Sequence, residues 1–376
     1  MEIAIIGGGI TGLTTALALK RLNIDATVYE KAPHLNEIGA GVWLQPNAIR
    51  VLQWLGIAQE VQSQGFLLNK MEITDSQLNP FKKIKNDVVS DQFGNQTIAI
   101  HRGKLQRLLH DMLSQHSEVK LNKAFQSFSV ENDRVHVQFE NSATTADLVL
   151  GADGIHSKVR SAMRLPSQFR KSGQICCRGI ANFQMPKALQ HEGKEVWGNK
   201  LRFGFSQLSK ETVYFFAVIN KSICPNELNR TTLSTLFKDF HPVILELINN
   251  ASGLHISELM DLKRLDSWHN STTCLLGDAA HATTPNMGQG ACQGIEDAYY
   301  ISQLLNKHLS TPVDAFQIFE DKRRAKVDYV VNNSWRFGKM AHDALGQKIL
   351  KGMMQLTPES MMSNQMNKLY SIEEIQ

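Results

Sequence analysis

The sequence predicts an α/β fold in which a dinucleotide-binding unit carries an inserted antiparallel sheet. Three observations lead to this prediction: a βαβ pattern with clustered glycines at the N-terminus, a second glycine-rich segment after a buried strand near residue 275, and aromatic-rich strands without intervening helices from about residue 171 to 265. The chain has 376 residues, 42% of them hydrophobic and 20% charged. It can therefore bury the cores of two ordinary domains or of one large α/β unit.

The N-terminal segment has the pattern of a dinucleotide-binding βαβ unit. Residues 2–6 resemble a buried strand, GGGITG follows at once, residues 13–22 have helical spacing, and residues 26–30 resemble a second strand. Such a unit binds a pyrophosphate at the helix N-terminus, and the acid that ends the second strand binds ribose hydroxyls. The candidate nucleotide-binding residues in this unit are Gly7, Gly9, Thr11, Gly12, Glu30 and Lys31.

The second glycine-rich segment, residues 274–298, predicts the other half of a ligand site. The apolar run 273–276 predicts a buried strand, and Asp278 follows at its carboxyl end, where open α/β sheets bind ligands. Pro285 restricts the loop, and Gly288 and Gly290 allow close approach of the backbone. The helix predicted from Ala291 directs its positive end at the loop, which suits an anionic or electron-accepting group. A strand, loop and helix without a ligand would explain Gly290 but not the rest.

The βαβ fingerprint alone fits FAD and NAD equally well, and two features favour FAD. The second motif lies far downstream, as a long ligand requires, and the sequence has no second GxGxxG for a separate nicotinamide domain. The segment GDAAHATTPNMGQGACQGIEDA, residues 277–298, closely resembles the second flavin motif of the class A FAD-dependent aromatic monooxygenases. This resemblance extends over nearly the whole chain.

The resemblance implies a p-hydroxybenzoate hydroxylase-type fold. This fold combines a Rossmann-like FAD-binding domain, an interleaved antiparallel-sheet substrate domain and C-terminal helices. On this basis we assign 1–70, 98–170 and 266–336 to the FAD-binding domain, 71–97 and 171–265 to the substrate-binding domain, and 337–376 to a C-terminal helical tail.

The resemblance also gives roles to further residues. Arg102 matches the family arginine that pairs with FAD phosphates or ribose; a cation at a helix start opposes the helix dipole, which favours an anionic partner over a solvated side chain. Asp153 matches an acid that ties the FAD region to the nicotinamide path, although it could equally be a turn residue. Asp278 is expected to accept a ribityl hydrogen bond. FAD contacts are thus expected at Gly41, Val42, Arg102, Asp153, Asp278, Pro285, Gly288, Gly290 and Ala291.

The catalytic candidates are Arg202, Tyr214 and Pro285. Pro285 is expected against the flavin, near its oxygen-reactive face. Arg202 and Tyr214 lie on two predicted strands, with a spacing that resembles the substrate-binding arginine and tyrosine of the urate hydroxylases. Asn286 stands where those enzymes have an aspartate, which argues against urate. Alternatively, Arg202 is a surface charge and Tyr214 an ordinary strand aromatic.

The activity implied by the resemblance is NAD(P)H-dependent monooxygenation. NADH or NADPH reduces FAD, O₂ adds at flavin C4a, and the hydroperoxide transfers one oxygen atom to an aromatic, heteroaromatic or polycyclic small molecule, by hydroxylation or epoxidation. A flavin reductase, a halogenase and a non-catalytic FAD-containing ligand-binding protein are the alternatives. The W-x-W-x-I-P segment of halogenases is missing from the sequence, and the intact FAD motifs argue against the non-catalytic alternative.

Composition excludes several other classes. The formal net charge of +4 is small for this length and favours neither a nucleic acid nor an anionic membrane as partner. No apolar run is long enough to span a membrane, and no secretion signal precedes the first strand, so we expect a cytoplasmic protein, monomeric or homodimeric. The five cysteines show neither C-x-x-C nor metal-ligand spacing, so we expect free thiols and no metal.

Further elements and two polar residues complete the prediction. Residues 119–124, 128–130 and 135–139 are expected to form antiparallel strands, and 71–73 to add a strand to the substrate domain. Residues 231–249 are expected to be helical around Pro242, and a long helix is expected from Phe319 to about Trp335, before a methionine-rich helical tail. Asn47 is expected to cap a helix, and His281 to be a structural histidine.

Overall fold

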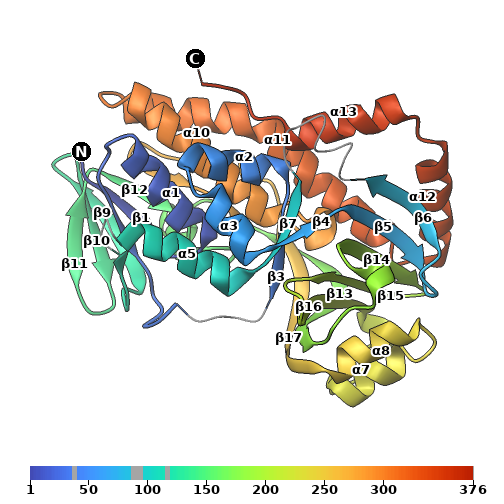
Figure 1. The fold of residues 1–376 in the computed structure, drawn as a ribbon. Helices are drawn as coiled ribbons and strands as arrows, with labels where there is room; N and C mark the ends of the chain where they lie inside the picture. The colour runs from blue at the N-terminus through green and yellow to red at the C-terminus, as the bar shows by residue number, and fades with distance from the viewer. Residues whose placement is uncertain (36–39, 86–95, 115–118, 376) are drawn as a thin grey trace.

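A five-stranded parallel sheet forms the centre of the nucleotide-binding part. The computed structural model describes residues 1–35, 40–85, 96–114 and 119–375 (Figure 1). The strand order is β18-β12-β1-β2-β8, and each neighbouring pair is parallel. The strands are β1 (Ile3–Ile6), β2 (Ala26–Tyr29), β8 (Val119–Lys120), β12 (Leu148–Gly151) and β18 (Thr273–Leu275).

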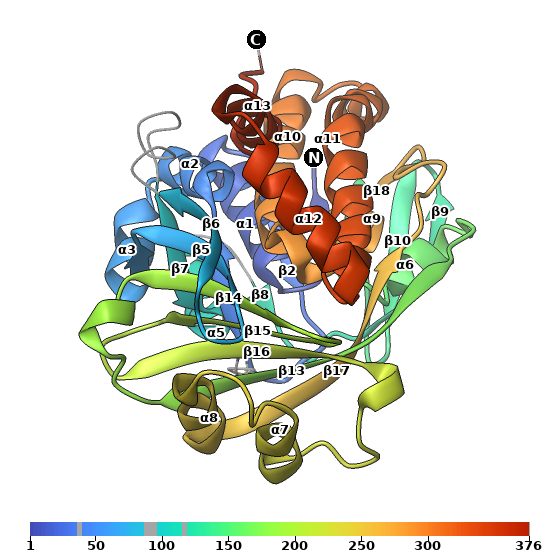
Figure 2. The ribbon, with the colours of Figure 1, turned by 90° about the vertical axis from the view of Figure 1, so that its right-hand side faces the viewer.

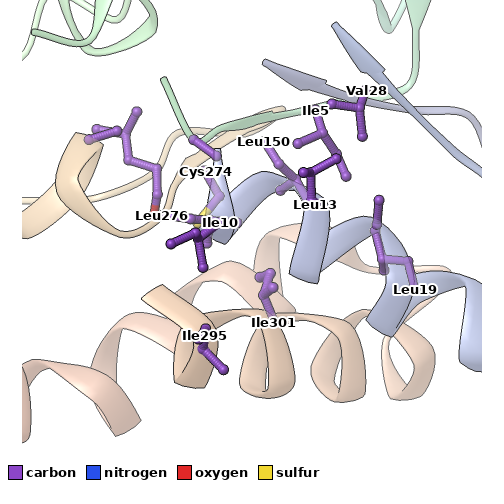
Figure 3. Close-up of a cluster of buried hydrophobic side chains, with 14 of the residues drawn as sticks. Ile5, Ile10, Leu13, Leu19, Val28, Leu150, Cys274, Leu276, Ile295 and Ile301 are labelled. Atoms are coloured by element: carbon purple, nitrogen blue, oxygen red, sulfur yellow. The ribbon is translucent and has the colours of Figure 1, made fainter. Parts of the chain in front are cut away.

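Helices cover this sheet, which explains why its central strands are almost wholly apolar. The helices α1 (Ile10–Arg21), α5 (Arg102–Ser114) and α10 (Gly290–Lys307) pack beside it, and α1 contacts both α5 and α10. Figure 3 shows the resulting core, in which Ile5, Leu13 and Leu150 meet Cys274, Ile295 and Ile301 from the second glycine-rich segment and its helix. The two glycine-rich motifs, almost 270 residues apart in sequence, are therefore joined through one hydrophobic core.

The predicted pairing of the strand at residues 119–124 is wrong. Residues 119–124 were expected to pair with the antiparallel strands that follow, but β8 covers only Val119–Lys120 and pairs in parallel with β2. The antiparallel sheet is formed instead by β9 (Phe125–Glu131), β10 (Arg134–Phe139) and β11 (Ala143–Ala146). The short apolar run at Val119 completes the edge of the buried sheet, and alternation alone cannot distinguish that position from an antiparallel one.

The second large sheet has seven strands in the order β17-β13-β16-β15-β14-β5-β6. Its neighbours are antiparallel except for the parallel pair β14 and β5. The prediction that residues 71–73 add a strand is confirmed, since β5 pairs with β14. The strands are β5 (Lys70–Asp75), β6 (Pro80–Lys85), β13 (Phe169–Asn182), β14 (Glu192–Gly198), β15 (Leu201–Gln207), β16 (Thr212–Asn220) and β17 (Ala251–Leu262).

The two faces of this sheet have different neighbours. Phe203, Phe205 and Phe215 point to an outer face, where they pack with residues of α7 (Arg230–Leu236) and α8 (Pro242–Asn249). Figure 2 shows these two helices below the sheet and the C-terminal helices α10 to α13 above it. Alternation along the strands places Arg202 and Tyr214 on the opposite face, which we call the inner face. The helical segment predicted around Pro242 is thus confirmed as two helices.

A small antiparallel sheet, β3-β7-β4, lies between the two parts of the molecule. Its strands are β3 (Gly41–Leu44), β4 (Phe66–Leu68) and β7 (Thr97–His101). The helix α2 (Pro46–Leu55) follows β3 and ends, as predicted, at Gly56. Of the segment 71–97 assigned to the substrate domain, residues 86–95 lie outside the described residues. Among the residues that the structure describes, the N-terminal two-thirds also contain α3 (Ala58–Gln64), α6 (Lys158–Ala162), η1 (Lys187–Leu189) and η2 (Lys221–Ile223).

Helices α11 (Pro312–Met340), α12 (Ala344–Leu356) and α13 (Glu359–Tyr370) form the C-terminal part. The long helix begins at Pro312, seven residues before the predicted start, because Pro312 occupies its first turn and Asp314 follows there. The predicted methionine-rich helical tail is confirmed as α12 and α13. All five cysteines are free thiols, as the sequence predicts.

Candidate functional site

The N-terminal glycine turn leaves one side of the α1 N-terminus open. Gly7 has φ +113°, which a side chain would strain, and a Cβ on Gly12 would lie 1.9 Å from the Gly7 carbonyl oxygen. A Cβ on Gly9, by contrast, would meet nothing within 4 Å. Gly9 precedes the first residue of α1 and gives the helix no side-chain cap. The first N–H groups of α1 therefore suit an anionic group of the size of a phosphate.

Two further candidates fix the shape of this turn. The half-buried Glu30 carboxylate accepts hydrogen bonds from the N–H of Gly8, at 2.6 Å, and from that of Ala32, at 2.8 Å. The Thr11 side chain lies against Gly277 and Gly294, since a Cβ on either glycine would approach its Oγ1 to 2.7 or 2.1 Å. Thr11 thus packs the first glycine motif against the second. Lys31, the candidate that follows Glu30, is exposed.

The second motif forms two short helical turns before α10. Gly277, with φ +55°, ends the strand segment; α9 (Asp278–His281) and η3 (Pro285–Met287) follow, and Gly288, with φ +64°, leads to α10. The helix begins at Gly290 with no acid in its first turn and no side-chain cap from Gln289. Pro285 is exposed, whereas Gly288, Gly290 and Ala291 are half-buried. The open N-terminus of α10 therefore faces the loop that carries Asp278 and Pro285.

Asp278 is reached by solvent although protein surrounds it. Burial raises the pKa of its carboxyl, the Arg102 and His281 charges oppose this rise, and Asp297 adds to it. No hydrogen bond to the Asp278 carboxylate is formed by any residue that the structure describes. A carboxylate acceptor at this loop is consequently left for a ligand with hydroxyl or N–H donors.

Asp297, about two turns into α10, has instead a full set of hydrogen-bond partners within the chain. It is fully buried and accepts hydrogen bonds from the Gly277 N–H at 2.9 Å, from His281 Nε2 at 2.6 Å and from Arg323 Nε at 2.8 Å. Burial alone would raise the pKa of Asp297, but His281 and Arg323 lower it below its usual range. His281 is thus a structural histidine, as predicted.

The same network corrects the prediction for Asn47. Asn47 is not the helix cap; Gln45 precedes α2, and the buried Asn47 lies within the first turn. Its Nδ2 donates to Gln289 Oε1 at 3.1 Å and to Glu296 Oε2 at 2.9 Å. Glu296 also forms ion pairs with Arg323 and Lys326. These partners lie far apart in sequence, so local patterns could not show that Asn47 joins α2 to α10.

Arg102 and Asp153 each lie at the start of a helix, Arg102 at α5 and Asp153 just before α6. Arg102 is the first residue of α5; its side chain is exposed, and its charge acts on both Asp278 and Tyr214. Asp153 accepts hydrogen bonds from the N–H groups of Lys158, at 2.7 Å, and Val159, at 3.1 Å, which open α6. The structure therefore gives Asp153 a local role at a helix start, alongside the role that the resemblance implies.

Arg202 connects the seven-stranded sheet to the second motif. Only 1% of this residue is exposed, so the alternative of a surface charge is wrong. Its guanidinium donates to Glu195 Oε1 at 2.9 Å, to Asn286 Oδ1 at 2.6 Å and to His342 Nδ1 at 3.3 Å. Asn286 belongs to η3, and its Nδ2 donates to the Ser334 carbonyl oxygen on α11 at 3.0 Å. The Arg202–Asn286 contact thus holds the inner face against the η3 turn.

Tyr214 lies on the same face, against β3. A Cβ on Gly41 would lie 2.4 Å from Tyr214 Cγ, so glycine is required for this approach. Val42, the next residue of β3, is half-buried and packs against the main core. Burial raises the pKa of the Tyr214 hydroxyl far above its usual range, in spite of the Arg178 and Arg102 charges that oppose the rise. Tyr214 is therefore a neutral hydrogen-bonding group.

Aromatic side chains cover the inner face between these residues. The Phe216 ring lies over Gly204, where a Cβ would come within 2.1 Å of its Cζ, and Trp43 Nε1 donates to Ser206 Oγ at 2.9 Å. Arg178 of β13, which pairs in register with Phe216, was not among the predicted site residues. Alternation with the buried Cys177 places Arg178 on the inner face, which is the only sequence signal that could have indicated it.

The comparisons with known proteins agree with this geometry. Residues 1–334 match the family described as FAD binding domain. The chain belongs to the family of FAD-dependent aromatic monooxygenases. A curated relative, aurachin C monooxygenase/isomerase of Stigmatella aurantiaca, is 30% identical over 345 residues, which cover 90% of this chain and 89% of the relative. The 3-amino-4-hydroxybenzoate 2-monooxygenase of Streptomyces cremeus is 28% identical, with 91% and 88% covered.

Solved structures of this family share the architecture. Klebsiella pneumoniae HpxO in complex with FAD and uric acid has a TM-score of 0.87 to this chain, at 25% identity, with 98% of this chain and 96% of that chain covered. The predicted fold class and the FAD cofactor are thereby confirmed.

The residues at the two glycine motifs fit FAD. Gly9 leaves open space at the start of α1, the α10 N-terminus has no side-chain cap, and the Asp278 carboxylate receives no hydrogen bond from the described residues. In the described part of the chain no group of three metal-ligating side chains lies together, and no helix there is long and apolar enough to cross a membrane.

Proposed function

We propose that the protein is an NAD(P)H-dependent monooxygenase that transfers one oxygen atom of O₂ to an aromatic or heteroaromatic small molecule. The substrate would lie between the η3 turn and the inner face of the seven-stranded sheet. The observation that carries this proposal is the Arg202–Asn286 hydrogen bond of 2.6 Å, which joins the aromatic inner face to the flavin motif. The named ligands of the relatives support the substrate class, since aminohydroxybenzoate and uric acid are rings that bear oxygen substituents.

In this proposal the glycine turn and the α1 N-terminus hold the FAD pyrophosphate, Glu30 and Arg102 contact the ribose or phosphates, and Asp278 accepts a hydrogen bond from the ribityl chain. The α10 N-terminus, at Gly290 and Ala291, stabilises negative charge on the reduced ring. When bound, FAD supplies the redox chemistry: hydride acceptance from NADH or NADPH and activation of O₂ at its C4a position.

The side chains of the inner face bind and orient the substrate. Because the Tyr214 hydroxyl stays protonated, it is a hydrogen-bond donor to a substrate oxygen and not a general base. Arg202 acts through Asn286, because its donors are taken by Glu195, Asn286 and His342. Phe216 and Trp43 provide an apolar surface that keeps water from the reacting atoms. Pro285, which is exposed on the η3 turn, would lie against the flavin ring.

Oxygen-dependent oxidation of NADH and NADPH by the FAD-containing protein tests the proposal. The substrates are a panel of phenols, hydroxybenzoates, quinolones and purines, and isotopically labelled O₂ follows the oxygen atom. We expect one class to stimulate oxidation strongly and to acquire one labelled atom. A protein whose flavin neither nucleotide reduces, or which oxidises them without consuming O₂, would contradict the proposal; the second result would indicate a reductase.

A further inference from the structure

Three arginines lie on the strands of the seven-stranded sheet, and two of them have a carboxylate partner. Arg170 on β13 forms a two-pronged pair with Asp261, at 2.8 and 2.6 Å. Arg202 on β15 pairs with Glu195. Arg178, also on β13, donates to Ser257 Oγ at 3.0 Å and lies near the Tyr214 hydroxyl, and both hydroxyls are neutral groups. No carboxylate lies within ion-pair distance of Arg178 in the described ranges 1–35, 40–85, 96–114 and 119–375.

This difference has an energetic consequence. A guanidinium keeps its proton in a protein, so Arg178 remains charged. Arg178 is half-buried. A cation that is partly withdrawn from water destabilises the folded state unless an anion compensates its charge. The Ser257 hydroxyl orients the guanidinium, and neither it nor the Tyr214 hydroxyl nearby supplies negative charge. Asp261 and Glu195 therefore compensate the charges of Arg170 and Arg202, whereas no carboxylate of the described residues compensates that of Arg178.

The position of Arg178 indicates what would supply that charge. Arg178 pairs in register with Phe216, and Phe216 with Gly204, on which the Phe216 ring lies. Arg178 is therefore directly opposite Phe216 on the inner face. The Tyr214 hydroxyl beside it also feels the charge of Arg102, so positive potential converges on this part of the inner face from two elements. A substrate ring stacked on the Phe216 side chain would place one of its substituents within reach of the Arg178 guanidinium.

We infer that Arg178 is the counter-charge for an anionic substituent of the substrate, so that the preferred ligands of this site are aromatic anions, with a carboxylate or a ring oxyanion, stacked on Phe216. This inference rests on the proposed function for the location of the substrate, but it concerns binding and not oxygen transfer. Ser257 is the positioning residue in this arrangement, because its hydroxyl accepts a hydrogen bond from Arg178. A guanidinium is suited to either kind of oxyanion because it offers two parallel donors.

Ligand binding to the oxidised holoprotein tests the inference without any turnover. The first probes are hydroxybenzoates paired with the corresponding neutral hydroxybenzamides, which test for recognition of a carboxylate. The second probes are nitrophenols measured at pH values below and above their pKa, which test for recognition of a ring oxyanion. Dissociation constants come from the change in the flavin absorbance spectrum. The proteins are the wild type, Arg178→Met, Arg178→Lys, and Lys171→Met, which removes an exposed charge from the same strand.

We expect the wild type to prefer the anionic member of at least one kind of pair. Arg178→Met should weaken binding of that anion about 10- to 100-fold and leave the neutral member nearly unchanged, because a charge-assisted hydrogen bond is lost. Arg178→Lys should recover part of the preference, and Lys171→Met should retain all of it. The inference is overturned if Arg178→Met prefers the anionic ligand as strongly as the wild type does. It is also overturned if the wild type binds no anion more tightly than the matching neutral ligand. Arg178-dependent anion binding in a protein that consumes no O₂ would instead retain this site and contradict the proposed function alone.

Discussion

Asp278 and Asp297 lie in one motif, and the structure treats them in opposite ways. Asp297 is buried, accepts three hydrogen bonds, two of them from His281 and Arg323, and has a lowered pKa. Asp278 is exposed, receives no hydrogen bond from the described residues, and has a raised pKa. A carboxylate whose partners are supplied by the chain stabilises the fold, whereas one whose partners are missing is available to a ligand. The same distinction separates Arg170 and Arg202 from Arg178.

The largest effect should follow from breaking the internal network. Asp297→Asn keeps the shape of the side chain but leaves the buried Arg323 and His281 with less negative charge to compensate them. We expect a loss of about 3–5 kcal/mol in the free energy of unfolding of the FAD-free protein. Urea denaturation followed by circular dichroism measures it. A variant as stable as the wild type would show that the paired carboxylate is not needed for stability.

Asp278→Asn should have the converse effect. Because its carboxylate makes no hydrogen bond to the described residues, the substitution should leave the stability of the FAD-free protein unchanged or slightly higher, since burial disfavours the charged form. The affinity for FAD should fall roughly 10- to 100-fold through the loss of a charged acceptor. Fluorescence titration of FAD gives the dissociation constant. An unchanged FAD affinity would remove Asp278 from the cofactor site.

A smaller effect is expected from pH at the Arg202 contact. Burial lowers the pKa of His342 to about 3, and the Arg202 charge adds to the shift. The unfolded chain binds this proton near pH 6.5 and the folded protein does not, so this stabilising contribution is present above pH 6.5 and is lost as the pH falls toward 3. Between pH 7 and 5.5 it should fall by about 1 kcal/mol. His342→Asn, which retains an acceptor for Arg202, should lose this part of the pH dependence; identical pH profiles would contradict the assignment.

The nucleotide-binding half could be predicted from sequence because its requirements are local. Gly7 and Gly9 lie between β1 and α1, Gly12 lies in the first turn of α1, and Asp278 follows β18 closely, so short patterns reveal these residues. The inner face could not be predicted to the same degree. The partners of Arg202 come from β14, η3 and the residues after α11. Arg178 differs from Arg202 only in having no carboxylate partner among the described residues. Such pairings depend on register between distant strands, which the sequence does not display.

The most direct test is the unfolding free energy of Asp278→Asn and Asp297→Asn, measured with and without saturating FAD. Bound FAD stabilises the folded state in proportion to the logarithm of its affinity. We predict that Asp297→Asn is destabilised in both conditions but keeps the FAD-dependent increment, and that Asp278→Asn matches the wild type without FAD and loses much of the increment. If Asp297→Asn lost the increment while Asp278→Asn kept it, paired and unpaired carboxylates would not divide between fold and cofactor as proposed.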